Sequence, residues 1–490
     1  MCYLKLTKSS GILLHPTSFP STYGIGELGE EAYAFIDFLV NSGQKLWQIL
    51  PLNPPGFGES PYQAYSAFAS NPLLISIDRL IAEGLLIYDD LYPRPDFPDD
   101  EVDYPSVSEY KYDLFKKAYS RFKAIPRSDK YKDYIQRNFF WLHDYSFFMA
   151  LREYFKQQPW NKWEKGIMNR EKEAIGHYEN LLADKIEYQY FLQFIVNVQW
   201  TEIKNYAREK EITIIGDLPI FVSYDSADTW VNPHLFELDE AGYITKMAGV
   251  PPDYFSETGQ LWGNPHYRWD KMEEDGYFWW RQRINTLLEI VDVVRLDHFR
   301  GFEAYWEIPG DAETAVNGRW VKGPGNKLFS VLKENLGELP LIAEDLGYIT
   351  PEVKELKDAF DFPGMKVLQF ISEENILQNP DDEDTIYYTG THDNDTLLGW
   401  YKKVVSSGLR RNEEDIKKDK ICWEFIKLLL KSKCRWTIFP LQDILCLDSW
   451  ARMNVPGTVG GRNWRWRYEK GSLTSALEER LLKLTEENGR

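Results

Sequence analysis

The sequence predicts an α/β protein, a (β/α)8 or TIM barrel with large, mainly helical insertions between its strands. Short apolar runs recur along the 490 residues, and helix-length connections separate several of them. Continuous apolar runs are typical of parallel strands covered on both faces, although buried helix segments share this property. The eight runs span residues 11–14, 46–52, 212–218, 291–297, 339–345, 365–370, 385–392 and 443–447.

The connections between these runs are uneven in length. About 160 residues separate the second run from the third, far more than the dozen or so that a βα crossover needs. From residue 109 to 210, aromatic and aliphatic residues recur at three- and four-residue steps. We therefore expect a largely helical insertion subdomain over about residues 80–210. A second insertion is expected over about residues 225–285.

Composition excludes several classes of partner. The chain has 57 basic and 76 acidic residues, a net charge of −19, which repels nucleic acid and anionic lipid. No apolar run approaches the roughly 18 residues of a membrane span, and the N-terminus has no secretory signal. We therefore expect a cytoplasmic protein, or a protein of the plastid stroma if a transit peptide has been removed.

The cysteines give no sign of a metal site or a disulfide framework. Cys2, Cys422, Cys434 and Cys446 contain no C-x-x-C pair, and reduced thiols in a cytosolic enzyme are the expected state.

No metal and no cofactor is expected. The seven histidines form no H-x-x-x-H pair, and the run from Asp393 to Asp395 lacks the glycine and the terminal glutamate of a calcium loop. Residues 24–29 spell G-x-G-x-x-G, but prolines precede them and no acidic residue follows about 20 positions on. A dinucleotide site requires both a tight strand-to-helix turn and that acid.

Carboxylates stand at the ends of four of the apolar runs: Asp217, Asp297, Glu344 and Asp393. A barrel brings the carboxyl ends of its strands to one face, so these acids are predicted to converge there. Two carboxyls about 5 to 5.5 Å apart support retaining glycoside chemistry. The alternative is that some of the 76 acidic residues end strands only as surface caps or ion pairs.

Arg295 alternates with Asp297 on one face of its predicted strand. A fixed cation there is expected to keep the Asp297 carboxylate ionised and available as a nucleophile. A neighbouring anion, in turn, raises the pKa of another clustered acid, which then stays protonated as a general acid.

Aromatic residues make up 15% of the chain, more than packing a core of this size requires. Tyr62 lies in residues 60–65, and Trp262 lies in the Pro- and Gly-containing segment 251–263. Flat aromatic faces match the C–H faces of glucose rings, although a single Trp is more often a core residue. The composition of the second segment disfavours regular structure and is typical of a mobile lid.

Several motifs together resemble one known family. They are RLDHFRG at 295–301, AEDLG at 343–347, GTHDN at 390–394, GDLPIFV at 216–222, ESPY at 59–62 and NVPGT at 454–458, together with the lid segment. At these residues the chain resembles the 4-α-glucanotransferases, the amylomaltases or disproportionating enzymes of glycoside hydrolase family 77 in the α-amylase clan. The resemblance implies one catalytic barrel over residues 1–490, with a lid at 249–263 and no separate C-terminal β-domain.

The resemblance also implies residue roles. Asp297 corresponds to the nucleophile, Glu344 to the general acid and base, and Asp393 to the acid that holds ring hydroxyls. The implied substrate-binding residues are Ser60, Tyr62, Asp217, Asp253, Gln260, Trp262, Arg295, His298, His392 and Asn463.

The expected reaction is transfer of α-1,4-glucan segments through a covalent glucosyl-enzyme. Donors would be maltodextrin, starch or glycogen chains, and the acceptor would be the 4-hydroxyl of glucose or a maltodextrin. The same acids would also serve a retaining maltodextrin hydrolase. A glucan-binding protein without catalysis is the alternative from another class.

Overall fold

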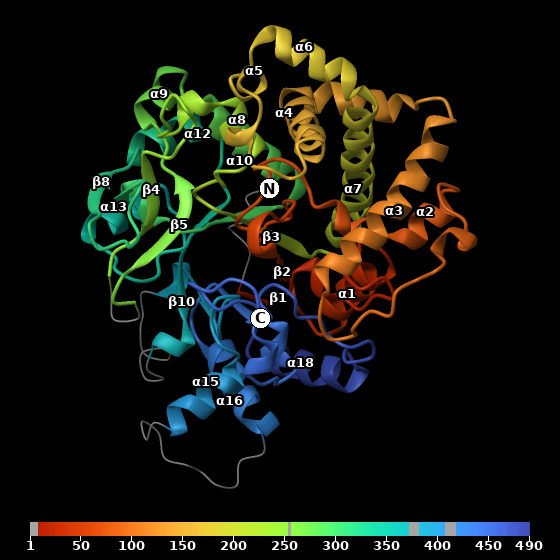
Figure 1. The fold of residues 1–490 in the computed structure, drawn as a ribbon. Coiled ribbons are helices and arrows are strands. Elements are labelled where there is room, and N and C mark those ends of the chain that lie inside the picture. Colours follow the sequence, from red (N-terminus) through yellow and green to blue (C-terminus); the bar gives the residue numbers. More distant parts are fainter. Residues whose placement is uncertain (1–7, 253–255, 372–381, 407–417) are drawn as a thin grey trace.

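Eight parallel strands form the central sheet of the computed structural model, which describes residues 8–252, 256–371, 382–406 and 418–490. Their order is β10-β11-β12-β1-β2-β3-β6-β9. The two outer strands of this order, β9 and β10, also meet: the Ala343 N–H at the end of β9 donates to the carbonyl of Pro363, just before β10, at 2.9 Å. The predicted (β/α)8 barrel is therefore confirmed (Figure 1). The strands are β1 (Ser9–Leu13), β2 (Leu46–Gln48), β3 (Thr213–Leu218), β6 (Val293–Leu296), β9 (Leu341–Ala343), β10 (Gly364–Val367), β11 (Thr385–Tyr388) and β12 (Trp436–Pro440).

The prediction of the eighth strand is wrong. The first seven apolar runs each overlap a barrel strand, but the eighth barrel strand is Trp436–Pro440 rather than 443–447. Residues Leu441–Ile444 instead form a short helix, α17, directly after that strand. A short apolar run has no periodicity that separates a strand from a buried helical turn. Here Asp443 accepts a hydrogen bond from the Leu397 N–H at 2.7 Å, which fixes the turn at the mouth of the barrel.

Six helices lie between β2 and β3, and Figure 1 shows them gathered on one side of the barrel in orange and yellow. They are α2 (Ile77–Ala82), α3 (Tyr104–Lys123), α4 (Asp129–Tyr154), α5 (Lys165–Met168), α6 (Lys172–Leu181) and α7 (Ala183–Glu209). The last of these, α7, packs on α4 and also on the barrel. The ring centroid of Trp200, near its C-terminal end, lies 5.9 Å from that of Trp47 on β2. This helix therefore joins the insertion to the barrel core.

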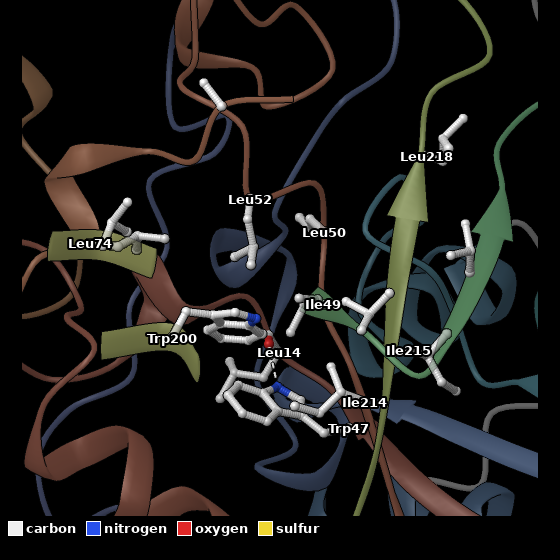
Figure 2. Packing of buried hydrophobic residues seen from close by; sticks show 14 of the residues in the cluster. Leu14, Trp47, Ile49, Leu50, Leu52, Leu74, Trp200, Ile214, Ile215 and Leu218 are labelled. Carbon is white, nitrogen blue, oxygen red and sulfur yellow. Dashed lines mark hydrogen bonds between the residues drawn. The ribbon is translucent and has the colours of Figure 1, made fainter. Parts of the chain in front are cut away.

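The core between α7 and the barrel strands is apolar. Trp47 is fully buried, and its indole N–H donates to the carbonyl of Leu14 at 2.9 Å (Figure 2). Ile214 and Ile215 of β3 pack in the same cluster. A buried indole with a satisfied N–H contributes a large apolar area without leaving a polar atom unpaired.

The other helices cover the remaining connections. They are α1 (Glu30–Asn41), α8 (Ala227–Val231), α9 (Trp269–Glu274), α10 (Phe278–Ile290), α11 (Arg300–Glu303), α12 (Gly325–Leu336), α13 (Pro351–Ala359), α15 (Leu397–Ser406), α16 (Lys418–Lys431) and α18 (Ser475–Glu487). Residues 441–490, all of which the structure describes, contain helices and one isolated β-bridge, from Trp466 to Glu101.

A second, antiparallel sheet stands beside the barrel and is drawn mainly in green in Figure 1. Its order is β5-β4-β7-β8, and its strands come from the connections after β3 and after β6. The expectation of irregular structure over residues 251–263 is wrong at the C-terminal flank, because residues 260–263 belong to β5, which pairs with β4. The other side of β4 pairs with β7. The strands are β4 (Lys246–Val250), β5 (Gln260–Pro265), β7 (Ala304–Pro309) and β8 (Arg319–Lys322).

The expectation of reduced thiols is also wrong for two cysteines. Cys422 on α16 forms a disulfide with Cys446, and their Cα atoms are 5.8 Å apart. The sequence could not show this pairing because it depends on the packing of α16 against α17. Cys434 is a buried thiol, and Cys2 lies outside the described residues.

The described ranges contain neither a membrane-spanning helix nor a metal-binding cluster of side chains. None of the helices that the structure describes is both long and apolar enough to cross a membrane. Within the same ranges, no group of three or more His, Cys, Asp or Glu side chains is arranged to hold a metal ion.

Candidate active site

Arg295 lies between two carboxylates at the mouth of the barrel. The parallel register of β3 and β6 places Asp217 opposite Arg295. The Arg295 Nη1 donates to both oxygens of Asp217, at 2.7 and 2.8 Å, and to Oδ1 of Asp297 at 3.0 Å. Arg295 is 4% exposed and Asp217 is 2% exposed. One buried cation is thus hydrogen-bonded to two carboxylates, and such pairing is the condition under which buried charge is tolerated.

Strand register also brings Asp297 and Glu344 together. Leu296 pairs with Ala343 across β6 and β9, so Asp297 and Glu344 each follow a paired position. The Glu344 N–H donates to the carbonyl of Leu296 at 3.1 Å. Neighbouring strands lie about 4.8 Å apart. This spacing suits the separation of about 5 to 5.5 Å between the two carboxyls of a retaining glycosidase.

Backbone amides hold the Glu344 side chain. The N–H of His298 donates to its Oε2 at 2.7 Å, and the N–H of Leu346 donates to its Oε1 at 3.1 Å. His298 has a φ of 50°, a left-handed conformation that a residue with a large side chain adopts only where the surroundings require it. This turn points the His298 amide at the carboxyl group.

The two acids differ in their affinity for protons. Burial raises the pKa of Glu344 to about 8, and the charge of Asp297 adds to this shift while Arg295 opposes it. Burial also raises the pKa of Asp297, to about 6, against the opposing effect of Arg295. At neutral pH Glu344 is therefore mainly protonated and Asp297 mainly ionised.

One of the expectations about these two acids needs correction. Arg295 does lower the pKa of Asp297, but loss of hydration outweighs it, so the pKa lies above its ordinary value. For Glu344, burial rather than the neighbouring anion is the main cause of the raised pKa. The sequence showed the neighbouring charges but not the depth of the site.

Tyr62, His392 and Asp393 extend the network from Asp217. The Tyr62 hydroxyl donates to Oδ2 of Asp217 at 2.7 Å and lies 3.4 Å from Nδ1 of His392. The Tyr62 and His392 rings stack at 5.0 Å with an interplanar angle of 19°. Nε2 of His392 lies 3.4 Å from Oδ1 of Asp393. Burial and the charge of Asp217 raise the pKa of Tyr62 well above its usual range, so its hydroxyl remains a donor.

Trp262 lies beside His298 on the other side of the site. Its ring contacts the imidazole edge to face at 4.9 Å, and its indole N–H donates to Oε1 of Gln260 at 3.2 Å. Among the described residues, Nε2 of His298 has no hydrogen-bond partner although it is buried. Burial lowers the pKa of His298 to about 4, so the ring is neutral. A neutral imidazole with an unsatisfied nitrogen is suited to a sugar hydroxyl.

Two of the predicted substrate-binding residues act within their own loops. The Oγ of Ser60 accepts a hydrogen bond from the Tyr62 N–H at 3.3 Å. The Asn463 amide donates to the Thr458 carbonyl at 3.2 Å, and its oxygen accepts from the Val455 N–H at 3.0 Å. These side chains therefore shape the two loops. Asp253 lies outside the described residues.

Two residues at the site were not predicted from the sequence. The Trp464 ring lies 5.7 Å from that of Tyr62 and 5.8 Å from that of His392. The Asn454 amide donates to Oδ1 of Asp393 at 2.6 Å. Trp464 belongs to a run of alternating Trp and Arg at 464–467, and that aromatic cluster was a usable signal for its role.

Comparison with known proteins identifies the family. The family model described as 4-alpha-glucanotransferase matches residues 14–474. A protein of Synechocystis named 4-alpha-glucanotransferase is 46% identical over 99% of this chain and 98% of its own length. A relative of the same name from Thermus thermophilus is 45% identical over 99% of each chain.

A solved structure agrees with this assignment. The amylomaltase from Streptococcus agalactiae, solved in complex with acarbose, is 41% identical, with a TM-score of 0.91 and 99% of both chains covered. The amylomaltase from Corynebacterium glutamicum shares the fold, with a TM-score of 0.77 at 18% identity over 99% of this chain and 75% of its own. With these matches over nearly its whole length, the chain belongs to the 4-alpha-glucanotransferase family.

Proposed function

We propose that this protein is a 4-α-glucanotransferase that moves α-1,4-glucan segments by a retaining double displacement. The observation that carries the proposal is the pair formed by Asp297 and Glu344. The two acids follow paired positions on neighbouring strands, and one is ionised at the pH at which the other holds its proton. A retaining enzyme needs this division between nucleophile and acid.

In the first displacement, Asp297 attacks the anomeric carbon of the donor sugar while Glu344 gives its proton to the departing glycosidic oxygen. Oδ1 of Asp297 is held by Arg295, so we assign the attack to Oδ2. The product is a β-glucosyl ester on Asp297 and a released glucan. Burial of Glu344 favours this proton transfer, because it keeps the carboxyl neutral until the leaving group needs its proton.

In the second displacement, the Glu344 carboxylate takes the proton of an acceptor 4-hydroxyl, and that oxygen attacks the ester. Glu344 is protonated again and Asp297 leaves as a carboxylate, so the cycle closes. Arg295 balances the returning charge, because it donates to Asp297 and Asp217 together.

We assign the reacting sugar to the space bordered by the Asp217 network. Asp393, with its Oδ1 held by Asn454, would bind ring hydroxyls and favour the distorted sugar of the transition state. His298 would add its unsatisfied nitrogen. The proposed substrate-binding set is Ser60, Tyr62, Asp217, Asp253, Gln260, Trp262, Arg295, His298, His392 and Asn463, of which Ser60 and Asn463 would act through loop shape.

The proposed donors are maltodextrin, starch or glycogen chains, and the proposed acceptors are glucose and maltodextrins. The family assignment and the sugar-like acarbose bound to the Streptococcus agalactiae relative support glucan as the substrate class. For the compartment we propose the cytoplasm or the plastid stroma. The relative from Solanum tuberosum, 40% identical, is named chloroplastic/amyloplastic.

Incubation of the pure protein with maltotriose tests the proposal. Transfer predicts glucose and longer maltodextrins by chromatography at a constant number of reducing ends. A steady rise in reducing ends without longer chains would instead identify a retaining hydrolase. Binding without any product would identify a non-catalytic glucan-binding protein.

A further inference from the structure

Arg300 is the centre of an aromatic cluster that the proposed mechanism does not use. Arg300 begins α11, three residues after Asp297. Its guanidinium carbon lies 3.7 Å from the centre of the Trp320 ring and 5.2 Å from the centre of the Tyr348 ring. Nη1 of Arg300 also donates to the Tyr348 carbonyl. Arg300 itself is 7% exposed, so its guanidinium joins the two aromatic residues from beneath the surface.

Tyr348 stands four positions after the catalytic acid Glu344 on the same loop. The Leu346 N–H binds the Glu344 carboxyl, and Gly347 then adopts a φ of 83°, a left-handed turn that glycine makes without steric cost. Beyond this turn the Tyr348 carbonyl is fixed by Arg300, while the Tyr348 side chain remains 76% exposed.

Trp320 is held by the second sheet. It lies on β8 opposite Trp306 of β7, and the two rings meet at 5.2 Å with an interplanar angle of 66°. The Trp306 indole N–H donates to the Ala315 carbonyl at 2.9 Å. Trp320 is nevertheless 39% exposed. An indole fixed by a sheet and open to solvent loses little conformational entropy when it binds a ligand.

Which part of a bound glucan would reach this cluster depends on where the cluster lies relative to Glu344. The general acid stands on the side of the leaving group, which is also the side from which the acceptor enters. Tyr348 follows Glu344 on the loop after β9, whereas Asp393 and the Tyr62 stack lie on the loops after β11 and β2. This order of loops favours the acceptor side, rather than the donor side, as the place of the cluster.

We propose that Trp320 and Tyr348, joined by Arg300, form a platform that binds the second and later sugars of an α-1,4-glucan acceptor. This inference rests on the proposed function. Exposed aromatic rings match the C–H faces of glucose, and the buried guanidinium holds both rings from beneath. A single exposed aromatic residue is common on a protein surface. Here, however, two rings share one buried cation, Arg300, which lies three residues after the nucleophile in the sequence.

The test separates acceptor binding from formation of the glucosyl-enzyme. The donor is α-maltotriosyl fluoride with its non-reducing 4-hydroxyl blocked, so that it occupies no acceptor position and cannot itself accept. Glucose serves as a one-sugar acceptor and maltotetraose as a long one. Full-length Trp320→Ala and Tyr348→Ala are compared with Tyr348→Phe, which keeps the ring, and with Tyr88→Ala, a residue 71% exposed in the helical insertion.

Each alanine variant is expected to raise the KM for maltotetraose about tenfold. The KM for glucose, the kcat and fluoride release without acceptor stay within about twofold of wild type. Tyr348→Phe and Tyr88→Ala behave as wild type. An unchanged KM for maltotetraose would overturn the platform.

An equal rise in KM for glucose would also overturn it, because the cluster would then only position Glu344. If Trp320→Ala fails to fold, the exposed Tyr348→Ala still decides the question. Failure of the wild type to transfer to either acceptor would contradict the proposed function as well.

Discussion

The two acids of the site are held in different ways. Asp297 belongs to a chain of side-chain contacts that runs through Arg295, Asp217 and Tyr62 to His392. Glu344 is bound by two backbone amides. Burial is the main cause of the raised pKa of both acids, but only Asp297 accepts a hydrogen bond from Arg295 among the contacts described for the pair. On the nucleophile side a fixed cation balances the charge. On the acid side loss of hydration keeps a proton in place.

This difference fits what each acid has to do. A nucleophile returns to the same anionic state after every cycle, so a permanent positive partner serves it well. A general acid must release its proton and recover it, and a fixed cation at Glu344 would favour the ionised form throughout. The network around Asp297 is therefore expected to tolerate little change, and the Glu344 side is expected to respond to the leaving group and to pH.

Removal of the nucleophile should have the largest effect. Asp297→Asn is expected to lower kcat for maltotriose disproportionation by about 10⁴-fold or more, because no covalent intermediate can form. Glucan binding, measured by calorimetry with maltoheptaose, should remain. Asp311→Asn changes an exposed carboxylate elsewhere on the chain and should be neutral. Substantial residual turnover by Asp297→Asn would refute the assignment.

The loss of activity on removal of the acid Glu344 should depend on the leaving group. Glu344→Gln is expected to lower kcat for maltotriose by about 10² to 10⁴-fold. With α-maltotriosyl fluoride the first step should be nearly normal, since fluoride leaves without a proton. Stopped-flow measurement of the fluoride burst checks this expectation. An equally large loss with both donors would mean that Glu344 does not act as the acid of the first step.

The pH profile should report both acids. Since Glu344 must be protonated, kcat/KM for maltotriose should fall about tenfold per pH unit above about 8. Since Asp297 must be ionised, it should fall in the same way below about 6. With α-maltotriosyl fluoride as the donor, the rate of the first step should no longer fall at alkaline pH. A rate that still falls there would show that a group other than Glu344 causes the decrease.

A smaller effect is expected from removing one hydrogen bond of the network around Asp297. Tyr62→Phe removes the hydroxyl that donates to Asp217 and is expected to lower kcat/KM about tenfold through the loss of one charge-assisted hydrogen bond. Tyr206→Phe is the matched control, because its hydroxyl donates to Asp37 at 2.6 Å on the outside of the barrel. Equal losses in the two variants would mean that Tyr62 has only a structural role.

The sequence predicted the barrel and the acids at its strand ends, because these follow from apolar runs and the residues that terminate them. It placed the eighth strand at 443–447 instead of Trp436–Pro440, since a short run carries no periodicity. The contact of Arg295 with Asp217 depends on strand register, and those of Tyr62 and Trp464 depend on loops far apart in the sequence. Strand register and contacts between distant loops cannot be deduced from short stretches of sequence. The pKa order of Asp297 and Glu344 likewise required the depth of the site.

Trapping the intermediate tests the central claim, that Asp297 is the nucleophile and Glu344 the acid, most directly. Glu344→Gln is mixed with the blocked α-maltotriosyl fluoride, quenched during the fluoride burst, digested and analysed by mass spectrometry. The expected result is a maltotriosyl adduct on the peptide that contains Asp297, attached to that side chain. An adduct on Asp217 or Asp393, or fluoride release with no covalent adduct, would contradict the account.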